Sequence, residues 1–327
     1  MSSKHNRKPG TLVISLDFEM FWGLADFARE DEWAPIIHGV HDVVPRLLNL
    51  FQEFGVHATW ATVGALMCDN KEEFINMLPY PHAAQTEKVI RRLQLSDDSQ
   101  NPKLDKMLFA PELVEMIQGC DGQEIGTHTF SHYYCDDSTS EPVQFYRELE
   151  ASRKLAEQKG YSFNAAVFPR NQVSEAYVAE IQKTPIKCYR GVEGGWIAKV
   201  KDKLGILGVS LWYLDNYIPL QRPCSFKAGA IEKHRPVNIR NSRFFKPYRP
   251  KYKILEGLKI KRYCHEMKFA ARHGEIYHIY WHPHNFAENT EINFEQMRTL
   301  LTHYRKMHDQ YGMKSLNMTE TVDRISD

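Results

Sequence analysis

Two histidines four positions apart give the strongest chemical signal in the sequence. His128 and His132 stand in the stretch HTFSH, directly after the strand-like segment QEIGT at 123–127. Residues four apart lie on the same face of a helical turn, so both imidazoles could reach one cation. Taken alone, the pair is compatible with capping or surface histidines as well as with a metal site.

Two acidic residues follow the first apolar segment of the chain. Asp17 and Glu19 flank Phe18 just after residues 11–16. Side chains two positions apart on an extended chain point to the same side, so both carboxylates can enter one pocket. One carboxylate of such a pair can bind a metal while the other accepts a proton. The spacing also fits a polar strand end that meets solvent.

A third group, YWHPH at 280–284, follows an apolar segment. His282 stands where that strand is expected to end, which is the position of catalytic residues in α/β barrels, and Pro283 restricts the turn that presents it. The three strand ends together supply two imidazoles and a carboxylate for a metal, with one carboxylate and one imidazole to spare. Two histidines and one carboxylate are a common catalytic zinc set that leaves a position open for water.

Alternating strands and helices are expected to position these residues. We predict strands at 11–16, 56–63, 123–127, 164–168 and 275–281, and helices at 41–54, 111–120, 143–159, 263–273 and 294–311. This alternation requires a mostly parallel sheet, closed or open, with active residues at the carboxyl ends of its strands. Segments 78–108 and 224–262 lack apolar periodicity for a core of their own. We therefore expect a single domain over 1–327 in which these two segments are irregular insertions.

Composition excludes several classes of protein. The 327 residues carry 42 Lys and Arg against 41 Asp and Glu, and 43% are hydrophobic, which argues against a disordered polyelectrolyte and against a generally basic nucleic-acid-binding protein. No apolar stretch suits a signal peptide or reaches the roughly 20 residues of a membrane span. We expect a soluble cytoplasmic protein that binds no nucleic acid, has no integral membrane segment and keeps its six cysteines reduced. Association with a second copy of the chain is left open.

From about Thr11 to Val322 the chain resembles the polysaccharide deacetylases of the NodB-homology type, carbohydrate esterase family 4. SLDFE at 15–19 resembles the acidic first motif of that family, and HTFSH matches its second motif, His-Ser/Thr-x-x-His. The resemblance implies a distorted (β/α) barrel with about seven strands. It also implies a divalent metal, with zinc as the first candidate, and hydrolysis of an N-acetyl group.

The resemblance assigns a role to each residue of the three strand ends. Asp17 resembles the catalytic base, Glu19 the metal carboxylate, His128 and His132 the metal imidazoles, and His282 the general acid. The family usually has two adjacent aspartates in the first motif. Because Phe18 intervenes here, the roles of Asp17 and Glu19 could be exchanged.

The remaining motifs match less closely. The third motif, usually Arg-x-Pro, is present only as FPRNQ at 168–172, where Arg170 could orient Asp17 or meet an anionic substrate. Asp215 in WYLDN is the candidate for tuning His282, and His284 is a second proton donor or a substrate contact. Aromatic side chains could form a platform for a sugar, with Phe21, Trp22, Trp196 and Trp212 as candidates. The residues predicted to bind substrate are Trp22, Asn171, His284 and Asp215.

The substrate implied by the resemblance is an acetamido sugar. Members without an export signal can act on cytoplasmic precursors, which favours a nucleotide- or lipid-linked sugar in bacterial surface polysaccharide (O-antigen, capsule or lipopolysaccharide) biosynthesis. Segment 234–262 carries ten Lys and Arg and one acid, and suits either a diphosphate or lipid head group or a solvated loop. Two alternatives stay open: another C–N hydrolase on the same barrel, similar to allantoinases, and a catalytically silent carbohydrate-binding barrel.

Overall fold

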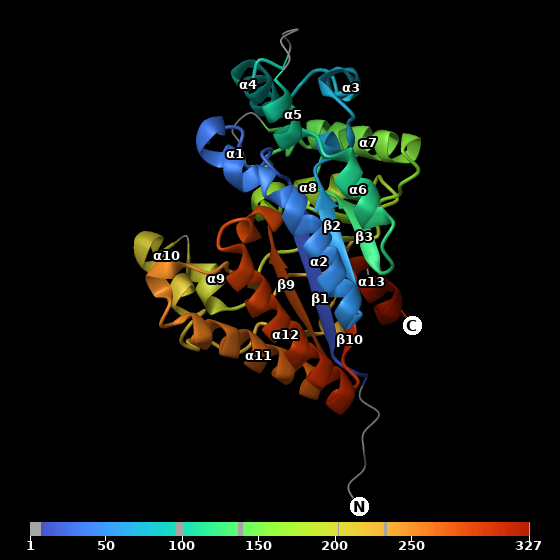
Figure 1. Cartoon of the computed structure of the whole chain (residues 1–327). Helices are drawn as coiled ribbons and strands as arrows, with labels where there is room; N and C mark the ends of the chain where they lie inside the picture. Colours follow the sequence, from blue (N-terminus) through green and yellow to red (C-terminus); the bar gives the residue numbers. More distant parts are fainter. Residues whose placement is uncertain (1–7, 96–100, 137–139, 202, 232–233, 327) are drawn as a thin grey trace, which may run out of the picture.

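Strands and helices alternate along most of the chain (Figure 1). The computed structural model describes residues 8–95, 101–136, 140–201, 203–231 and 234–326. The strands are β1 (Thr11–Phe18), β2 (Ala58–Thr62), β3 (Gln123–Thr127), β4 (Ala165–Val167), β5 (Cys188–Arg190), β6 (Phe226–Lys227), β7 (Val237–Asn238), β8 (Arg243–Phe244), β9 (Glu275–Trp281) and β10 (Lys314–Ser315). The α-helices are α1 (Glu30–His38), α2 (Val40–Phe54), α3 (Lys71–Met77), α4 (Ala84–Arg92), α5 (Pro102–Leu108), α6 (Pro111–Gln118), α7 (Pro142–Gln158), α8 (Glu175–Ile181), α9 (Trp196–Lys201), α10 (Gly205–Leu214), α11 (Glu256–His273), α12 (Thr290–Tyr311) and α13 (Met318–Ser326).

The main sheet is parallel and is centred on β1. Its order is β9-β1-β2-β3-β4-β5-β7, with β6 antiparallel to β9 and β10 paired with the start of β1. All eight residues of β1 are buried, because neighbouring strands flank it and helices cover the sheet. Helices α2, α11 and α12 lie against the outer side of β1 and β9 (Figure 1).

A short segment after β7 brings the two edges of this sheet together. β7 pairs with β5, and β8, only a few residues later, pairs with β9. Between β7 and β8, the backbone amide of Asn241 donates to the carbonyl of Gly191 at 3.0 Å. The backbone amide of Ser242 donates to the carbonyl of His278 at 2.7 Å. The sheet therefore curls into a distorted (β/α) barrel, as the resemblance implied, with eight strands along its main path.

The predicted elements agree with the observed ones where periodicity is strong. The strands at 123–127 and 275–281 coincide with β3 and β9, and α2 ends at Gly55, whose φ of +63° is the left-handed conformation of a helix C-cap. The expectation of irregular structure was wrong for much of 78–108, which contains α4 and α5. Their apolar side chains, among them Val89 and Met107, join the main core, so these helices need no core of their own.

The sequence also led to expectations about the state of the cysteines and about segments that span a membrane. The six cysteines are free thiols, and Cys68, Cys188 and Cys224 are buried. Among the described residues, no helix combines the length and the apolar character that crossing a bilayer requires.

Candidate active site

The residues singled out in the sequence meet at one end of the barrel. Asp17 is the last residue but one of β1, and Glu19 directly follows that strand. His128 and His132 follow β3, and His282 follows β9. The carboxyl ends of parallel strands share one edge of a sheet, which is why these distant segments converge.

Glu19, His128 and His132 form a buried group of metal-binding side chains. One potential ligand atom from each lies within 4.8 Å of the others. Glu19 Oε2 is 3.1 Å from His132 Nε2 and 3.4 Å from His128 Nε2. His128 Nδ1 donates to the carbonyl of Val167 at 2.8 Å, so the lone pair of this imidazole is on Nε2, which is buried and has no hydrogen-bond partner. These donors fit a divalent ion such as zinc.

Charge keeps the carboxylate of this group ionised. Burial alone would raise the pKa of Glu19. The charge of His282, the nearby imidazole of His128 and the hydrogen bond from His132 outweigh that effect and hold the pKa of Glu19 well below its usual value. Glu19 is thus a carboxylate with its negative charge directed at the two imidazoles.

The loop that carries the two histidines is not helical, contrary to the prediction. Thr129 and His132 adopt left-handed φ values of +65° and +60°, which are uncommon for residues other than glycine. Glu148 of α7 holds this loop, because its carboxylate accepts from the amide of Ser131 at 2.7 Å and from the Ser131 hydroxyl at 2.8 Å. Burial raises the pKa of Glu148 to about 7 despite these hydrogen bonds. Sequence analysis missed Glu148, since an acid in an amphipathic helix gives no sign of burial.

Asp17 forms a buried ion pair with Arg190, at the end of β5. Arg190 Nη1 and Nη2 donate to the two carboxylate oxygens at 2.5 and 2.7 Å, and both side chains are almost fully buried. Burial would raise the pKa of Asp17, but the charge and hydrogen bonds of Arg190 lower it. Arg190 also donates to Asn171 Oδ1 at 2.9 Å. The predicted substrate-binding residue Asn171 therefore lies in the site and orients Arg190.

The prediction that Arg170 orients Asp17 was wrong. Arg170 donates to Asp26 at 3.0 Å and lies over the ring of Tyr134 at 3.8 Å. It has a left-handed φ of +55°, as does Asn171, and the backbone turns here from the strand into the surface of the site. Arg170 lines the cavity, so its contact with an anionic substrate stays a prediction.

His282 lies beside both carboxylates and reaches the cavity. Its Nε2 is 3.6 Å from Asp17 Oδ2 and 3.6 Å from Glu19 Oε1, and 26% of its side chain is exposed. Nδ1 is 3.3 Å from Asn285 Oδ1. The ring stacks on His284 at 5.0 Å, and burial lowers the pKa of His284 to about 4. His284 is therefore neutral near pH 7.

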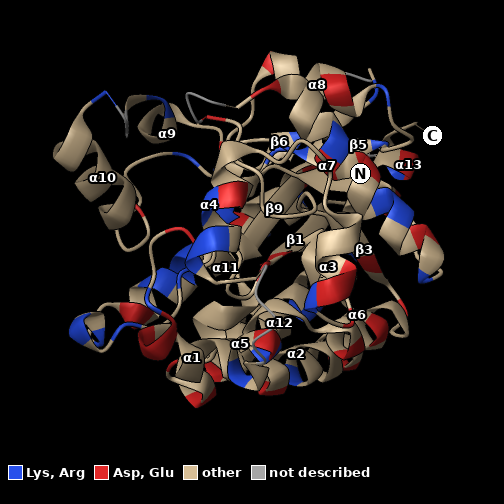
Figure 2. Ribbon diagram, turned by 90° about the horizontal axis from the view of Figure 1, so that it is seen from above, with Lys and Arg blue, Asp and Glu red and all other residues tan. Residues whose placement is uncertain are grey.

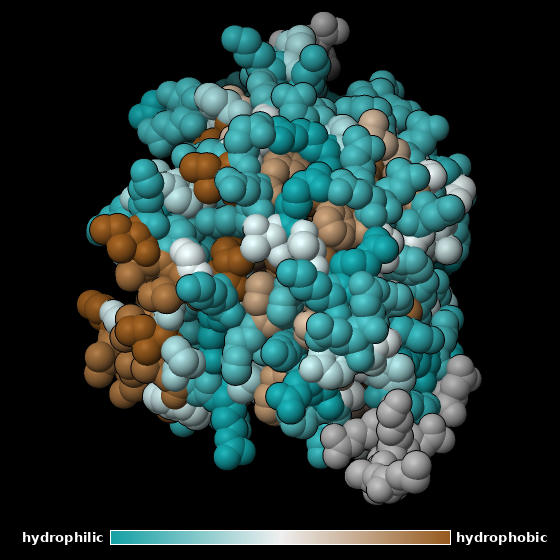
Figure 3. Space-filling view, turned by 60° about the horizontal axis from the view of Figure 1, so that its bottom comes forward, coloured by the Kyte–Doolittle hydropathy of each residue, from teal (hydrophilic) through white to brown (hydrophobic). Residues whose placement is uncertain are grey.

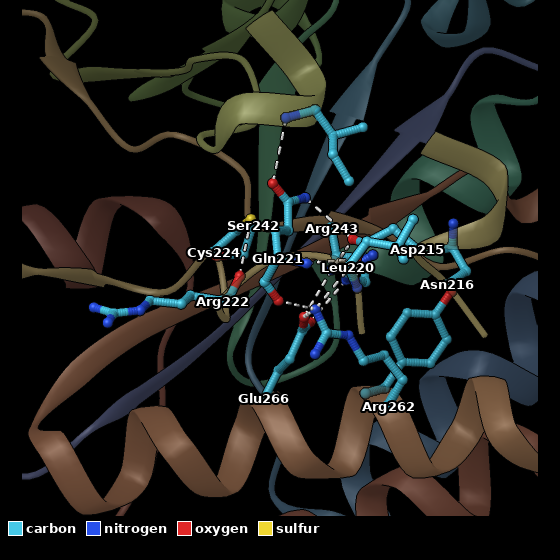
Figure 4. Close-up of polar contacts among 12 residues, drawn as sticks. Asp215, Asn216, Leu220, Gln221, Arg222, Cys224, Ser242, Arg243, Arg262 and Glu266 are labelled. Atoms are coloured by element: carbon cyan, nitrogen blue, oxygen red, sulfur yellow. Dashed lines mark hydrogen bonds and ion pairs between the residues drawn. The ribbon is translucent and has the colours of Figure 1, made fainter. Parts of the chain in front are cut away.

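Asp215 belongs to an ion cluster apart from His282, so the prediction that it tunes His282 was wrong. Figure 4 shows this cluster. Asp215 Oδ2 accepts from Arg243 at 2.9 Å, and Oδ1 lies 3.5 Å from Arg262. Glu266 binds both arginines, at 2.7 and 3.1 Å. All four side chains are buried. The cluster ties the end of α10 to β8 and α11.

Trp22 is a core residue and was wrongly predicted to bind substrate. Only 2% of it is exposed, its indole N–H donates to the carbonyl of Leu108 at 2.8 Å, and its ring packs on Phe74 at 4.9 Å. Of the other aromatic candidates, Phe21 is buried, whereas Trp212 of α10 lines the cavity.

The cavity above these residues is open and has a volume of about 840 Å³. Asp17, Glu19, His132 and His282 lie in its wall. The rest of the wall includes Phe27, Trp212, Phe244, Arg249 and Tyr280. This size and mixed polarity suit a small polar ligand such as a sugar.

Part of this chain, including two of the site histidines, is similar to a known protein family. Residues 31–189 match the family model described as polysaccharide deacetylase. This part of the chain is therefore similar to the polysaccharide deacetylases. The matched segment contains His128 and His132, whereas Asp17, Glu19 and His282 lie outside it. Comparison with curated proteins gives no match.

Solved structures of polysaccharide deacetylases and of a related hydrolase share the fold. A candidate polysaccharide deacetylase from Mycobacterium smegmatis has a TM-score of 0.59 at 12% identity, over 99% of this chain and 93% of the other. A probable polysaccharide deacetylase from Pseudomonas aeruginosa PAO1 has a TM-score of 0.55 at 10% identity, over 96% and 89%. Puue allantoinase also has a TM-score of 0.55 at 10% identity, over 96% and 89%. At these identities the likeness shows the fold alone.

Proposed function

We propose that this protein is a metal-dependent N-deacetylase that removes the acetyl group from an acetamido sugar. The observation that carries the proposal is the buried group of Glu19, His128 and His132 beside Asp17 and His282, open to one cavity. These three side chains would hold a divalent metal, with zinc as the first candidate. When bound, such an ion would polarise the amide carbonyl and stabilise the negative charge that develops on its oxygen.

The positions of the other side chains support this proposal. Asp17 is ionised because Arg190 lowers its pKa, and it would accept the proton of the attacking water. Arg190 binds both oxygens of that carboxylate and so fixes its orientation. His282 would donate a proton through Nε2 to the departing amine, while Asn285 accepts from Nδ1. The products are acetate and a free amino sugar.

We further propose that the sugar is linked to a nucleotide or a lipid through phosphate, as in the assembly of an O-antigen or capsule. Arg170 and Arg249 both line the cavity and are both exposed. Guanidinium groups bind phosphate oxygens in pairs, so these two arginines suit a phosphorylated carrier next to the sugar.

Metal analysis and acetate release from purified protein test the proposal. His128→Ala and His132→Ala should each lose bound metal and acetate release from acetamido sugars and nucleotide sugars. Asp17→Asn should retain the metal and lose turnover. His273→Ala, which changes an exposed histidine at the end of α11, is the matched control and should keep both properties.

Three results would count against the proposal. Retention of metal and turnover by either site-histidine variant would remove its basis. Loss of metal in Asp17→Asn would show that Asp17 and Glu19 have exchanged roles. Ring opening of small cyclic amides, or ammonia release from small linear amides, without acetate release from any sugar would indicate a different C–N hydrolase.

A further inference from the structure

Helix α10 exposes an unusual amount of apolar surface. Its sequence, GILGVSLWYL, contains no charged residue. Ile206 is 88% exposed, Leu207 is 61% exposed and Val209 is 46% exposed. Figure 3 shows hydrophobic side chains gathered at the left edge of the molecule, where Figure 1 places α9 and α10. Helices on the surface of a globular protein normally turn a polar face to water, and contiguous apolar patches of this kind mark interaction sites.

A second exposed apolar stretch adjoins this helix. Ile254, Leu255 and Leu258, at the start of α11, are 94%, 37% and 42% exposed. The ring of Tyr252 connects the two stretches, because it packs against Tyr213 of α10 at 5.8 Å and against Tyr217 at 5.9 Å. We call the combined area the α10 surface. It comprises Ile206, Leu207, Val209, Ile254, Leu255 and Leu258.

Exposed basic side chains border the α10 surface on two sides. Lys199 and Lys203 precede α10, and Arg249, Lys251 and Lys253 precede α11. Two acids close to these segments, Asp215 and Glu256, are not part of the exposed border in the described part of the chain. Asp215 is buried with Arg243, and Glu256 is buried with Lys259. In Figure 2, α10 is tan along its length, and blue segments of the neighbouring chain lie close to it.

We infer that the α10 surface docks this protein on an anionic lipid membrane. Projecting aliphatic side chains with a border of lysine and arginine are the composition of segments that lie in the interface of a bilayer. The apolar side chains would enter the acyl boundary, and the cations would contact lipid phosphates and anionic head groups. A second copy of this chain fits less well, because a symmetric contact through this surface would bring the same basic border towards itself.

Docking in this way would place the entrance of the cavity at the membrane. Trp212 of α10 and Arg249 line the cavity that contains Asp17 and His282. A substrate carried in the bilayer would then reach the site without leaving the membrane surface. The inference about docking does not depend on the deacetylase chemistry, because the α10 surface contains none of the proposed catalytic or metal-binding residues.

Co-sedimentation with lipid vesicles tests the inference. The full chain should bind vesicles of phosphatidylcholine mixed with phosphatidylglycerol, and bind pure phosphatidylcholine much more weakly. Ile206→Asn combined with Leu207→Asn should weaken binding by about tenfold or more, because two large apolar side chains no longer enter the bilayer. The matched control is Met116→Asn combined with Val143→Asn, which changes exposed apolar residues on α6 and α7 and should bind like the wild type.

A charge-reversal pair tests the basic border. Lys251→Glu combined with Lys253→Glu should weaken binding to the anionic vesicles by about tenfold, and should reduce the sensitivity of binding to added salt. Lys88→Glu combined with Lys154→Glu makes the same change in charge at exposed positions on α4 and α7 and should have little effect.

Several outcomes would overturn the inference. Absence of binding to anionic vesicles would do so, as would equal binding by the wild type and the Ile206 and Leu207 variant. Sedimentation velocity that showed a dimer in the wild type, lost in that variant, would assign the α10 surface to self-association instead. Thermal unfolding confirms that each variant is folded. Acetate release from a soluble substrate should be unchanged in the Ile206 and Leu207 variant, so failure of docking can be distinguished from failure of the proposed chemistry.

Discussion

Replacing Arg190 by methionine should destabilise the protein strongly. Methionine retains much of the length of arginine but lacks the guanidinium, so both oxygens of Asp17 lose the donors that are now at 2.5 and 2.7 Å. The side chains of Arg190 and Asp17 are 0% and 4% exposed, so water reaches little of the carboxylate that loses its partner. Breaking a buried ion pair from one side typically costs about 3–5 kcal/mol of unfolding free energy, because the remaining charge is left unpaired.

Arg170→Met is the matched control. Arg170 pairs with Asp26 at 3.0 Å, but its side chain is 40% exposed. Exposed ion pairs contribute less than about 1 kcal/mol, so this variant should differ little from the wild type. Adding Asp17→Asn to Arg190→Met should restore part of the lost stability, because it removes the stranded charge.

Urea denaturation followed by tryptophan fluorescence and circular dichroism measures these differences. Equal unfolding free energies for Arg190→Met and Arg170→Met would refute the assignment of Arg190 as the partner of Asp17. A further loss of stability in the double variant, equal to the loss in Asp17→Asn alone, would show that the two residues are energetically independent.

Three further predictions concern residues around the barrel. Glu148→Ala leaves the amide and hydroxyl of Ser131 without their acceptor, and should cost about 2 kcal/mol in urea denaturation and lower zinc affinity about tenfold in calorimetry. Glu320 raises the pKa of His57, and His57 lowers the pKa of Glu320. Their pair therefore stabilises the fold fully above pH about 4.3, the ordinary pKa of a glutamate, and this stabilisation is lost as the pH falls through the lowered pKa of Glu320. This stabilisation disappears as the pH rises through the raised pKa of His57. Glu320→Gln should therefore lower the melting temperature more at pH about 5.5 than at pH about 9, and an equal loss at both would contradict this reasoning. Asp215→Ala should cost about 3 kcal/mol in urea denaturation and leave metal content unchanged, whereas loss of metal would tie Asp215 to the site.

Much of the barrel could be predicted because its elements have strong periodicity. The strand at 275–281 is apolar and is followed by a proline, and the helix at 40–54 repeats apolar residues every three or four positions and stops at a glycine. Parallel strands also force their carboxyl ends together, which is why Asp17, Glu19 and the histidines converge as expected. These inferences need only local patterns and a rule of topology.

The errors arose where the direction of a side chain depends on distant backbone. Arg170 follows β4 and Arg190 ends the neighbouring strand β5, and only Arg170 was predicted as a partner of Asp17. A left-handed backbone at Arg170 accompanies its pairing with Asp26, whereas Arg190 ends an extended strand and points inwards. Trp22 is buried, and its indole donates to the carbonyl of Leu108, 86 positions away in the sequence. No local pattern carries that information.

The segment that closes the barrel continues into the loop that borders the entrance of the active-site cavity. Residues 241–245 complete the sheet, and Pro247 and Arg249, a few positions later, border the cavity. The proposed metal-binding side chains come from the ends of β1 and β3 instead. A change in length between 246 and 253 would therefore alter which molecules can enter while the metal-binding side chains stay in place. For protein engineering, this loop is the part of the scaffold to exchange when a new substrate preference is wanted.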